Sequence, residues 1–195
     1  MKMTTETAVM IYGRFQPPTK AHAELFDKLL EIAFSTKEPT SGYIFISPKV
    51  DRKTNPLSWF TRYNFLCKLY PDIDFVDHSD IKDPFGAVHF LGGLGHKHII
   101  VIAGSDQAGR LEKQLPKYIR HPDPKLAFLN VETIKVIKFG YRDPDSYDFI
   151  ESLSATKARQ AVKDKQFVRF CEAIPVCSLE DSEQLYCDVR KGLDK

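Results

Sequence analysis

Short apolar runs alternate with amphipathic stretches along the chain of 195 residues. Continuous apolar runs such as residues 8–12 and 99–103 are typical of buried strands, whereas apolar positions three and four apart, as in residues 21–34, predict helices. Alternation of the two predicts an α/β fold, Rossmann-like and doubly wound, with a mostly parallel sheet and helices on both faces. We expect strands at 8–12, 43–47, 74–77, 98–103 and 133–139, and helices at 21–34, 58–70, 84–94, 106–115, 154–163, 166–172 and 179–191.

The composition is that of a folded protein with a substantial core. A hydrophobic content of 43% is enough for a packed interior, and 195 residues suit one domain with a small appendage. We therefore expect a main domain over residues 1–165 and a C-terminal helical extension, 166–195, packed on it. The formal net charge of +2 comes from interspersed acids and bases. Proteins that bind duplexes carry a concentrated basic surface, so no nucleic-acid partner is expected.

Cysteine spacing and the longest apolar runs bear on the cellular compartment. None of the four cysteines forms a Cys-x-x-Cys pair, which predicts free thiols and no metal held by the protein. No apolar run approaches transmembrane length, so no membrane partner is expected. These patterns favour a cytoplasmic protein. They leave the oligomeric state open, with a homo-oligomer as one option.

The most informative stretch is residues 13–22, Gly-Arg-Phe-Gln-Pro-Pro-Thr-Lys-Ala-His, between the first expected strand and helix. Gly13 permits close approach of the backbone to a ligand. Thr19 and His22 are three apart and lie on one side of the first helical turn. Unpaired N–H groups and the helix dipole make such a helix start an anion site. The alternative is a simple helix cap beside a partly buried histidine.

Two further segments follow expected strands. Lys53, Asn55, Ser58 and Arg62 belong to a basic turn and the helix after it, which either gathers cations around an acidic substrate or is an ordinary capped helix. Gly104 and Asp106 follow the most apolar strand. The glycine lets a ligand approach the backbone, and Asp106 is expected to cap the next helix.

A second anion site is predicted at residues 154–159. Ser154 suits a helix cap, and Thr156, Lys157 and Arg159 follow in the first turns. Positive residues at a helix start oppose the dipole, so helix stability does not explain them, whereas a bound anion does. Two such helix starts indicate one nucleoside triphosphate held between them. The chain lacks both the P-loop motif and Gly-x-Gly-x-x-Gly in the first loop.

Together these motifs resemble a known superfamily, the nucleotidyltransferases that share their fold with class I aminoacyl-tRNA synthetases. Residues 13–22 resemble its first signature, Gly-x-Phe-x-Pro-x-His/Thr-x-Gly-His, and residues 153–159 resemble the second, Ile-Ser-Ser-Thr-x-x-Arg. The first loop and residues 55–62 are most similar to nicotinamide-mononucleotide adenylyltransferases of archaeal and phage type. Thr19 stands where many adenylyltransferases have histidine, and cytidylyltransferases often have threonine at this position.

The resemblance implies an enzyme that transfers AMP from ATP to a phosphate-bearing acceptor such as nicotinamide mononucleotide, releasing pyrophosphate. Mg²⁺ would accompany the triphosphate, held mainly by ligand and water. One alternative is a cytidylyltransferase that uses CTP and a small phosphorylated alcohol or sugar, and another is a non-catalytic nucleotide-binding module. By matching position, catalytic roles go to Thr19, His22, Lys157 and Arg159, nucleotide binding to Gly13, Arg14, Phe15, Gln16, Gly104, Asp106, Ser154 and Thr156, and acceptor binding to Lys53, Asn55 and Arg62.

Overall fold

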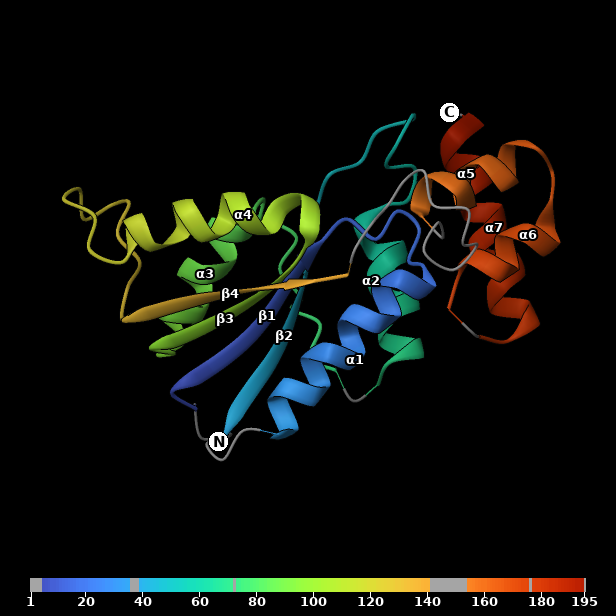
Figure 1. Cartoon of the computed structure of the whole chain (residues 1–195). Coiled ribbons are helices and arrows are strands. Elements are labelled where there is room, and N and C mark those ends of the chain that lie inside the picture. Colours follow the sequence, from blue (N-terminus) through green and yellow to red (C-terminus); the bar gives the residue numbers. More distant parts are fainter. Residues whose placement is uncertain (1–4, 36–38, 72, 141–153, 176, 195) are drawn as a thin grey trace. The chain divides into compact units, whose positions relative to one another are not determined.

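The computed structural model describes residues 5–35, 39–71, 73–140, 154–175 and 177–194 (Figure 1). The loop at residues 141–145, which the sequence leaves open as a lid or as plain surface, lies outside the described residues. The strands are β1 (Thr7–Gly13), β2 (Thr40–Ile46), β3 (His98–Gly104) and β4 (Thr133–Phe139), and the helices are α1 (Lys20–Ser35), α2 (Trp59–Leu69), α3 (Pro84–Gly93), α4 (Ser105–Gln114), α5 (Ala155–Lys163), α6 (Phe167–Ala173) and α7 (Leu179–Asp194), with a 3-10 turn, η1 (Leu115–Tyr118).

The chain forms two compact units. Unit 1 comprises Met1–Tyr12, Leu25–Phe45 and Ile81–Arg142, and unit 2 comprises Gly13–Glu24, Ile46–Asp80 and Asp143–Lys195. Unit 1 contains nearly all of the sheet. Unit 2 contains both resemblance motifs and the basic turn between them. The separate extension predicted for residues 166–195 stays a prediction, and its helices α6 and α7 belong to unit 2 together with α5.

The sheet of unit 1 has the strand order β2-β1-β3-β4. β1 pairs in parallel with β3, and β3 in parallel with β4, with Val9 opposite Ile100 and Ile100 opposite Lys135. Helices α4 and α1 flank the sheet in Figure 1, and α4 packs against β3 and β4. The α/β prediction is therefore confirmed. Because the chain order reverses between β1 and β3, the carboxyl ends of these two strands form the topological switch point where such sheets bind ligands.

Burial explains why these segments become strands. Ala8, Val9 and Met10 of β1 have no exposed surface, as expected for a central strand covered on both faces. β4 instead alternates between exposed and half-buried positions, which is the pattern of an edge strand. In the described part of the chain, every helix is too short or too polar to serve as a membrane span.

The strand predicted at residues 74–77 is wrong. Ile73 N–H donates to the Tyr70 carbonyl, and Phe75 N–H donates to the Ile73 carbonyl, at 3.2 and 3.0 Å. These local bonds turn the backbone just before Phe75, so that a single bridge at Phe75 stands in place of the expected strand. The apolar side chains of Ile73 and Phe75 are buried all the same.

Unit 2 has a core of its own beneath α5, α6 and α7, the orange and red helices of Figure 1. Loop 46–58 packs closely on α7, because a Cβ atom at Gly192 would lie 2.2 Å from the carbonyl oxygen of Pro56. The core cluster consists of Leu57, Ala158, Ala161, Val162, Phe170, Ala173, Ile174, Leu185 and Val189.

Candidate functional site

The first loop is built around a buried phenylalanine. Phe15 has a φ of 48°, in the left-handed region that costs a non-glycine residue roughly 1–2 kcal/mol. Its ring occupies the space beside Gly13, where a Cβ atom would lie 2.4 Å from Phe15 Cζ. Gly13 is therefore needed for packing within the loop. The nucleotide contacts predicted for Gly13 and Phe15 stay predictions.

Thr19 and His22 form a cap at the start of α1. The Thr19 carbonyl accepts the Ala23 N–H at 3.1 Å, and the Thr19 N–H donates to His22 Nδ1 at 3.0 Å. A backbone N–H is always a donor, so Nδ1 is unprotonated and the neutral ring carries its proton on Nε2. Thr19 Oγ1 lies 2.9 Å from the same nitrogen, and Phe15 meets the ring edge to face at 5.1 Å. The imidazole is thus fixed in orientation and tautomer.

The Gln16 side chain connects the first loop to the chain before α2. Its amide nitrogen donates to the Leu57 carbonyl at 2.8 Å, and its amide oxygen accepts the Leu57 N–H at 2.9 Å. Both ends of this buried amide are engaged by one residue's backbone. The geometry gives Gln16 an architectural role, and its predicted nucleotide contact stays a prediction.

Arg62 is fully buried and bonds to backbone carbonyls from three segments of unit 2. Fixed in this way, its guanidinium holds the loops after β1 and β2 against the start of α2. Its predicted acceptor contact stays a prediction, beside a structural role that the sequence did not indicate. The carbonyls belong to Arg14, Ser47 and Ser58, at N···O distances of 2.6, 2.8 and 3.1 Å.

A tight turn at residues 51–55 carries the other two predicted acceptor residues. The Asp51 carboxylate accepts the Thr54 N–H at 2.7 Å and also a bond from the Asn55 side-chain amide. The backbone bond from Thr54 and the amide bond from Asn55 hold the pKa of Asp51 well below its usual range. Lys53 stands exposed at the tip of this turn. Asp51, which the sequence reasoning missed, has the spacing of an Asx turn as its signal.

Asn55 has an unusual environment for a polar side chain. It is buried, and its amide nitrogen donates within the turn, to Asp51 and Thr54. Its Oδ1 accepts no hydrogen bond from any of the described residues. Most buried hydrogen-bond acceptors are paired, so Asn55 Oδ1 is a candidate to accept a hydrogen bond from a ligand.

Arg159 brings the second motif to the first. Its Nη1 donates to the Gln16 carbonyl at 2.6 Å, and its Nη2 donates to Thr156 Oγ1 at 3.1 Å. Ser154 caps α5 as predicted, accepting the Lys157 N–H at 3.3 Å. Thr156 and Lys157 are exposed in the first turn of α5. The two motifs, far apart in sequence, thus meet within unit 2.

Positive charge is crowded around this meeting point. Burial lowers the pKa of Arg159, the nearby Arg14 lowers it further, and the Asp51 carboxylate raises it. Arg14 is exposed, whereas Arg159 is almost fully buried. An anion bound beside both guanidinium groups would offset their repulsion. This electrostatic arrangement suits phosphate.

The third pair, Gly104 and Asp106, belongs to unit 1. Gly104 itself is the N-cap of α4, with no side-chain cap bond, so the cap predicted for Asp106 is wrong. Asp106 lies in the first turn, where a carboxylate favours the helix dipole without accepting a cap bond. A Cβ atom at Gly104 would lie 2.8 Å from Asp106 Oδ1, so the glycine leaves room for that carboxylate. Their nucleotide contacts stay predictions.

Comparison with known proteins bears on the fold. No protein-family model matches the sequence, and no curated protein matches it. A solved structure of TmcAL from Thermotoga maritima, bound with alpha-thio ATP, is similar in fold with a TM-score of 0.51 and 13% sequence identity. The similarity covers 93% of this chain and 55% of that one, so the chain spans little more than half of that protein's length. The Rossmann-like α/β fold predicted from the sequence is confirmed.

Proposed function

We propose that this chain is a nucleotidyltransferase that binds ATP and transfers AMP to a small phosphorylated acceptor, with release of pyrophosphate. The observation that carries the proposal is the hydrogen bond from Arg159 to the Gln16 carbonyl. This bond joins, within one unit, the two motifs predicted to bind phosphate. The alpha-thio ATP bound to the TmcAL structure of similar fold supports ATP as the first nucleotide to test.

The proposed chemistry is an attack by an acceptor phosphate oxygen on the α-phosphorus, with pyrophosphate as the leaving group. Catalysis then consists of alignment and of charge stabilisation on the transferred group. Arg159, Arg14 and Lys157 supply positive charge for the phosphates. His22 donates from Nε2 as a neutral ring, since the Thr19 N–H holds its Nδ1 as an acceptor. Ser154 and Thr156 line the start of α5.

The acceptor is proposed to lie against the turn at residues 51–55. Asn55 Oδ1 accepts a hydrogen bond from a hydroxyl or amide of the acceptor, and Lys53 attracts its phosphate. Nicotinamide mononucleotide offers an amide, hydroxyls and a phosphate. Mg²⁺ would be held by the triphosphate and water, which is how this ion usually binds at such sites.

Pyrophosphate release is measured with Mg²⁺ and each of ATP, GTP, CTP and UTP, in parallel with nicotinamide mononucleotide and with a phosphorylated alcohol or sugar as acceptor. We expect turnover with ATP. Turnover with CTP alone, and only with a phosphorylated alcohol or sugar, would replace the adenylyl proposal by the cytidylyl alternative. ATP binding without turnover on any acceptor would instead indicate a non-catalytic module.

Two His22 variants separate its cap from its chemistry. His22→Gln retains an acceptor for the Thr19 N–H, as in a capping box, whereas His22→Ala removes it. We expect both to lower turnover by orders of magnitude, because contacts made in the transition state govern rate. Only His22→Ala should also lose stability, by about 1 kcal/mol. Unchanged turnover in His22→Gln would remove the imidazole from the mechanism.

A further inference from the structure

Gln16 connects the turn at residues 51–55 with the arginine of the second motif. Its buried side-chain amide pairs with both backbone groups of Leu57, at 2.8 and 2.9 Å, and also donates to the Lys49 carbonyl at 3.4 Å. Its own main-chain carbonyl accepts a hydrogen bond from Arg159 Nη1 at 2.6 Å. One residue therefore holds the chain on both sides of the turn with its side chain, and holds Arg159 with its backbone.

The turn that precedes Leu57 is stiffened by its own hydrogen bonds. Asp51 and Asn55 exchange two backbone bonds, at 2.9 and 3.2 Å, and the Asp51 carboxylate accepts further backbone N–H groups inside the turn. Only Pro56, whose φ is fixed by its ring, separates Asn55 from Leu57. The position of the turn therefore follows the position of Leu57, which Gln16 sets.

Arg159 interacts with the turn by charge as well. Burial and the nearby Arg14 lower the pKa of Arg159, and the Asp51 carboxylate of the turn raises it. The guanidinium also donates from Nη2 to Thr156 Oγ1 at 3.1 Å, at the start of α5. A displacement of the turn would move the Asp51 carboxylate and so change the electrostatic attraction that the guanidinium experiences.

We infer that Gln16 is a positioning residue that couples the turn at residues 51–55 to Arg159. The inference rests on the proposed function, in which the turn holds the acceptor and Arg159 holds phosphate groups of the nucleotide. A ligand that orders one of these two sites also orders the other through Gln16, and the effect is reciprocal. An amide suits this role because the Leu57 backbone offers one donor and one acceptor, and a side-chain amide pairs with both.

Hydrogen exchange in the full chain, measured by NMR without any ligand, tests the coupling. The Leu57 N–H donates to the Gln16 side chain, and the Asn55 N–H donates within the turn. In Arg159→Met both amides should exchange about tenfold faster than in the parent, because Gln16 loses one of its anchors. Arg159→Lys keeps a donor for the Gln16 carbonyl and should give intermediate rates. Unchanged exchange of both amides in these two variants would overturn the inference.

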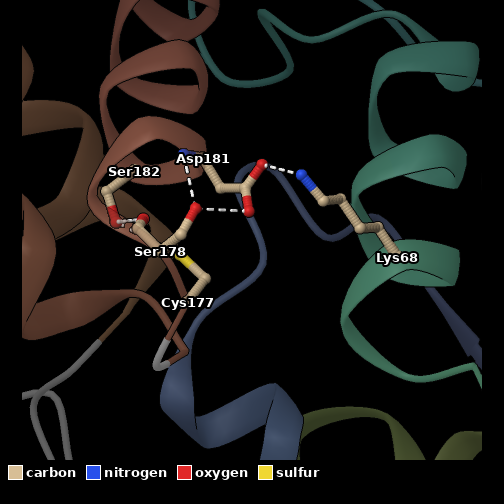
Figure 2. Close-up of polar contacts among 5 residues, drawn as sticks. All are labelled: Lys68, Cys177, Ser178, Asp181 and Ser182. Carbon is tan, nitrogen blue, oxygen red and sulfur yellow. Dashed lines mark hydrogen bonds and ion pairs between the residues drawn. The ribbon is translucent and has the colours of Figure 1, made fainter.

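Ser178→Ala is the matched control in the same unit. It removes the cap of α7, in which the Ser178 hydroxyl accepts the Asp181 N–H, and leaves Gln16 and the turn unaltered (Figure 2). Rates are taken relative to the Phe170 amide of α6, whose side chain lies in the core cluster, so that a general loss of stability cancels. On this scale the control should stay within about twofold of the parent.

Steady-state kinetics with ATP and nicotinamide mononucleotide add a readout that stability alone does not move. A general loss of stability lowers kcat through the folded fraction and leaves KM unchanged, as we expect for Ser178→Ala. In Gln16→Met, kcat should fall by about 100-fold and the KM of the acceptor should rise, because the two sites lose their mutual alignment. Gln16→Glu keeps an oxygen for the Leu57 N–H but loses the donor, so it should lie between Gln16→Met and the parent.

The two measurements separate the coupling from the proposed function. An unchanged acceptor KM in Gln16→Met, in an active enzyme, would overturn the positioning role of Gln16. If no acceptor supports turnover in the parent, the proposed function fails, and the exchange rates of the Leu57 and Asn55 amides alone decide whether Arg159 and the turn are coupled.

Discussion

The interior of unit 1 and the interior of unit 2 are stabilised by different kinds of interaction. Unit 1 rests on a parallel sheet whose central strands are buried and apolar. Unit 2 buries many polar groups, and of the buried polar or charged side chains among the described residues only His96 belongs to unit 1. Those of unit 2 are Gln16, Thr19, Ser47, Asn55, Arg62, Arg159 and Ser182.

The difference shows where a binding site can be built. Apolar packing tolerates many side chains of suitable volume, whereas a buried polar network depends on every partner. Unit 2 aligns its loops through directional bonds from Gln16, Arg62 and Arg159 to backbone carbonyls. Such bonds fix loop positions in a way that apolar contacts do not, which is what a preorganised binding site requires.

The largest expected effect is that of Arg62→Leu. The carbonyls of Arg14 and Ser47 would lose this side-chain donor, whereas the Ser58 carbonyl would keep its bond from the backbone N–H of residue 62. Each unsatisfied group costs roughly 1–3 kcal/mol, so we expect a loss of about 2–5 kcal/mol in the free energy of unfolding of unit 2. The single tryptophan, Trp59, lies in unit 2 and reports its unfolding in urea by fluorescence. Arg169→Leu, at an exposed position on α6, is the control and should stay within about 0.5 kcal/mol of the parent. Equal stability of the two variants would contradict the structural role of Arg62.

Alanine substitution at two helix glycines should change the stability of the protein in opposite directions. Gly192→Ala in α7 would drive a Cβ atom into the Pro56 carbonyl, and we expect a loss of about 1–3 kcal/mol. Gly109→Ala in α4 meets nothing within 4 Å, so the better helix propensity of alanine should stabilise the protein by about 0.5–1 kcal/mol. Melting temperatures of the two variants, compared with the parent, check the prediction. A stabilising Gly192→Ala would show that α7 is not packed on loop 46–58.

A third test concerns His96, the buried polar residue of unit 1. Its Nε2 lies 3.0 Å from the Tyr43 hydroxyl and its Nδ1 lies 2.7 Å from the Thr5 carbonyl. Burial lowers the pKa of His96, with the Thr5 bond opposing that shift. His96 therefore binds a proton more readily in the unfolded chain than in the folded one. Its contribution to the free energy of unfolding is fully present above about pH 6.5 and declines as the pH falls, by at most about 1.4 kcal/mol per pH unit.

Protection of β1 and β3 amides in hydrogen exchange, corrected for intrinsic rates, measures this decline between pH 7.5 and pH 5. His96→Gln is the control, because its side chain does not titrate and should flatten the pH dependence. The same pH dependence in both proteins would assign the effect to other groups.

The smallest effects are expected at the surface of unit 2. The Lys68 side chain is 67% exposed, so Lys68→Ala should cost less than about 1 kcal/mol despite the 2.6 Å ion pair with Asp181. Ser178→Ala removes a helix cap and should cost about 1 kcal/mol. Urea titrations followed by Trp59 fluorescence rank the two. A larger loss in Lys68→Ala would mean that the ion pair is part of the stabilising network.

The fold could be predicted well from the sequence because its signals are local. Apolar runs and helical periodicity located the sheet strands and the helices, and Ser154 caps α5 as expected. The segment at residues 74–77 was mispredicted because a short apolar alternation looks the same whether a whole strand or a single residue pairs, and only Phe75 forms a bridge. Only a partner strand distinguishes the two, and that is a non-local property.

The site was predicted in part for the same reason. The motifs of residues 13–22 and 154–159 meet within unit 2, whereas their roles as anion sites stay predictions. Gln16 was assigned a nucleotide contact by its position in the resemblance, and Arg62 an acceptor contact as part of the basic turn and the helix after it. Their partners at Leu57 and Arg14 are 41 and 48 residues away in sequence, and no local pattern encodes such pairings.

The fit of the Phe15 ring over Gly13 constrains how this loop can change over evolutionary time. Any side chain at position 13 would meet the ring at 2.4 Å, so a mutation there is tolerated only after position 15 has become smaller. Replacement of Phe15 alone by a smaller side chain, in turn, leaves a gap beside the His22 ring. The two positions are therefore epistatic, and relatives that keep the phenylalanine are expected to keep the glycine.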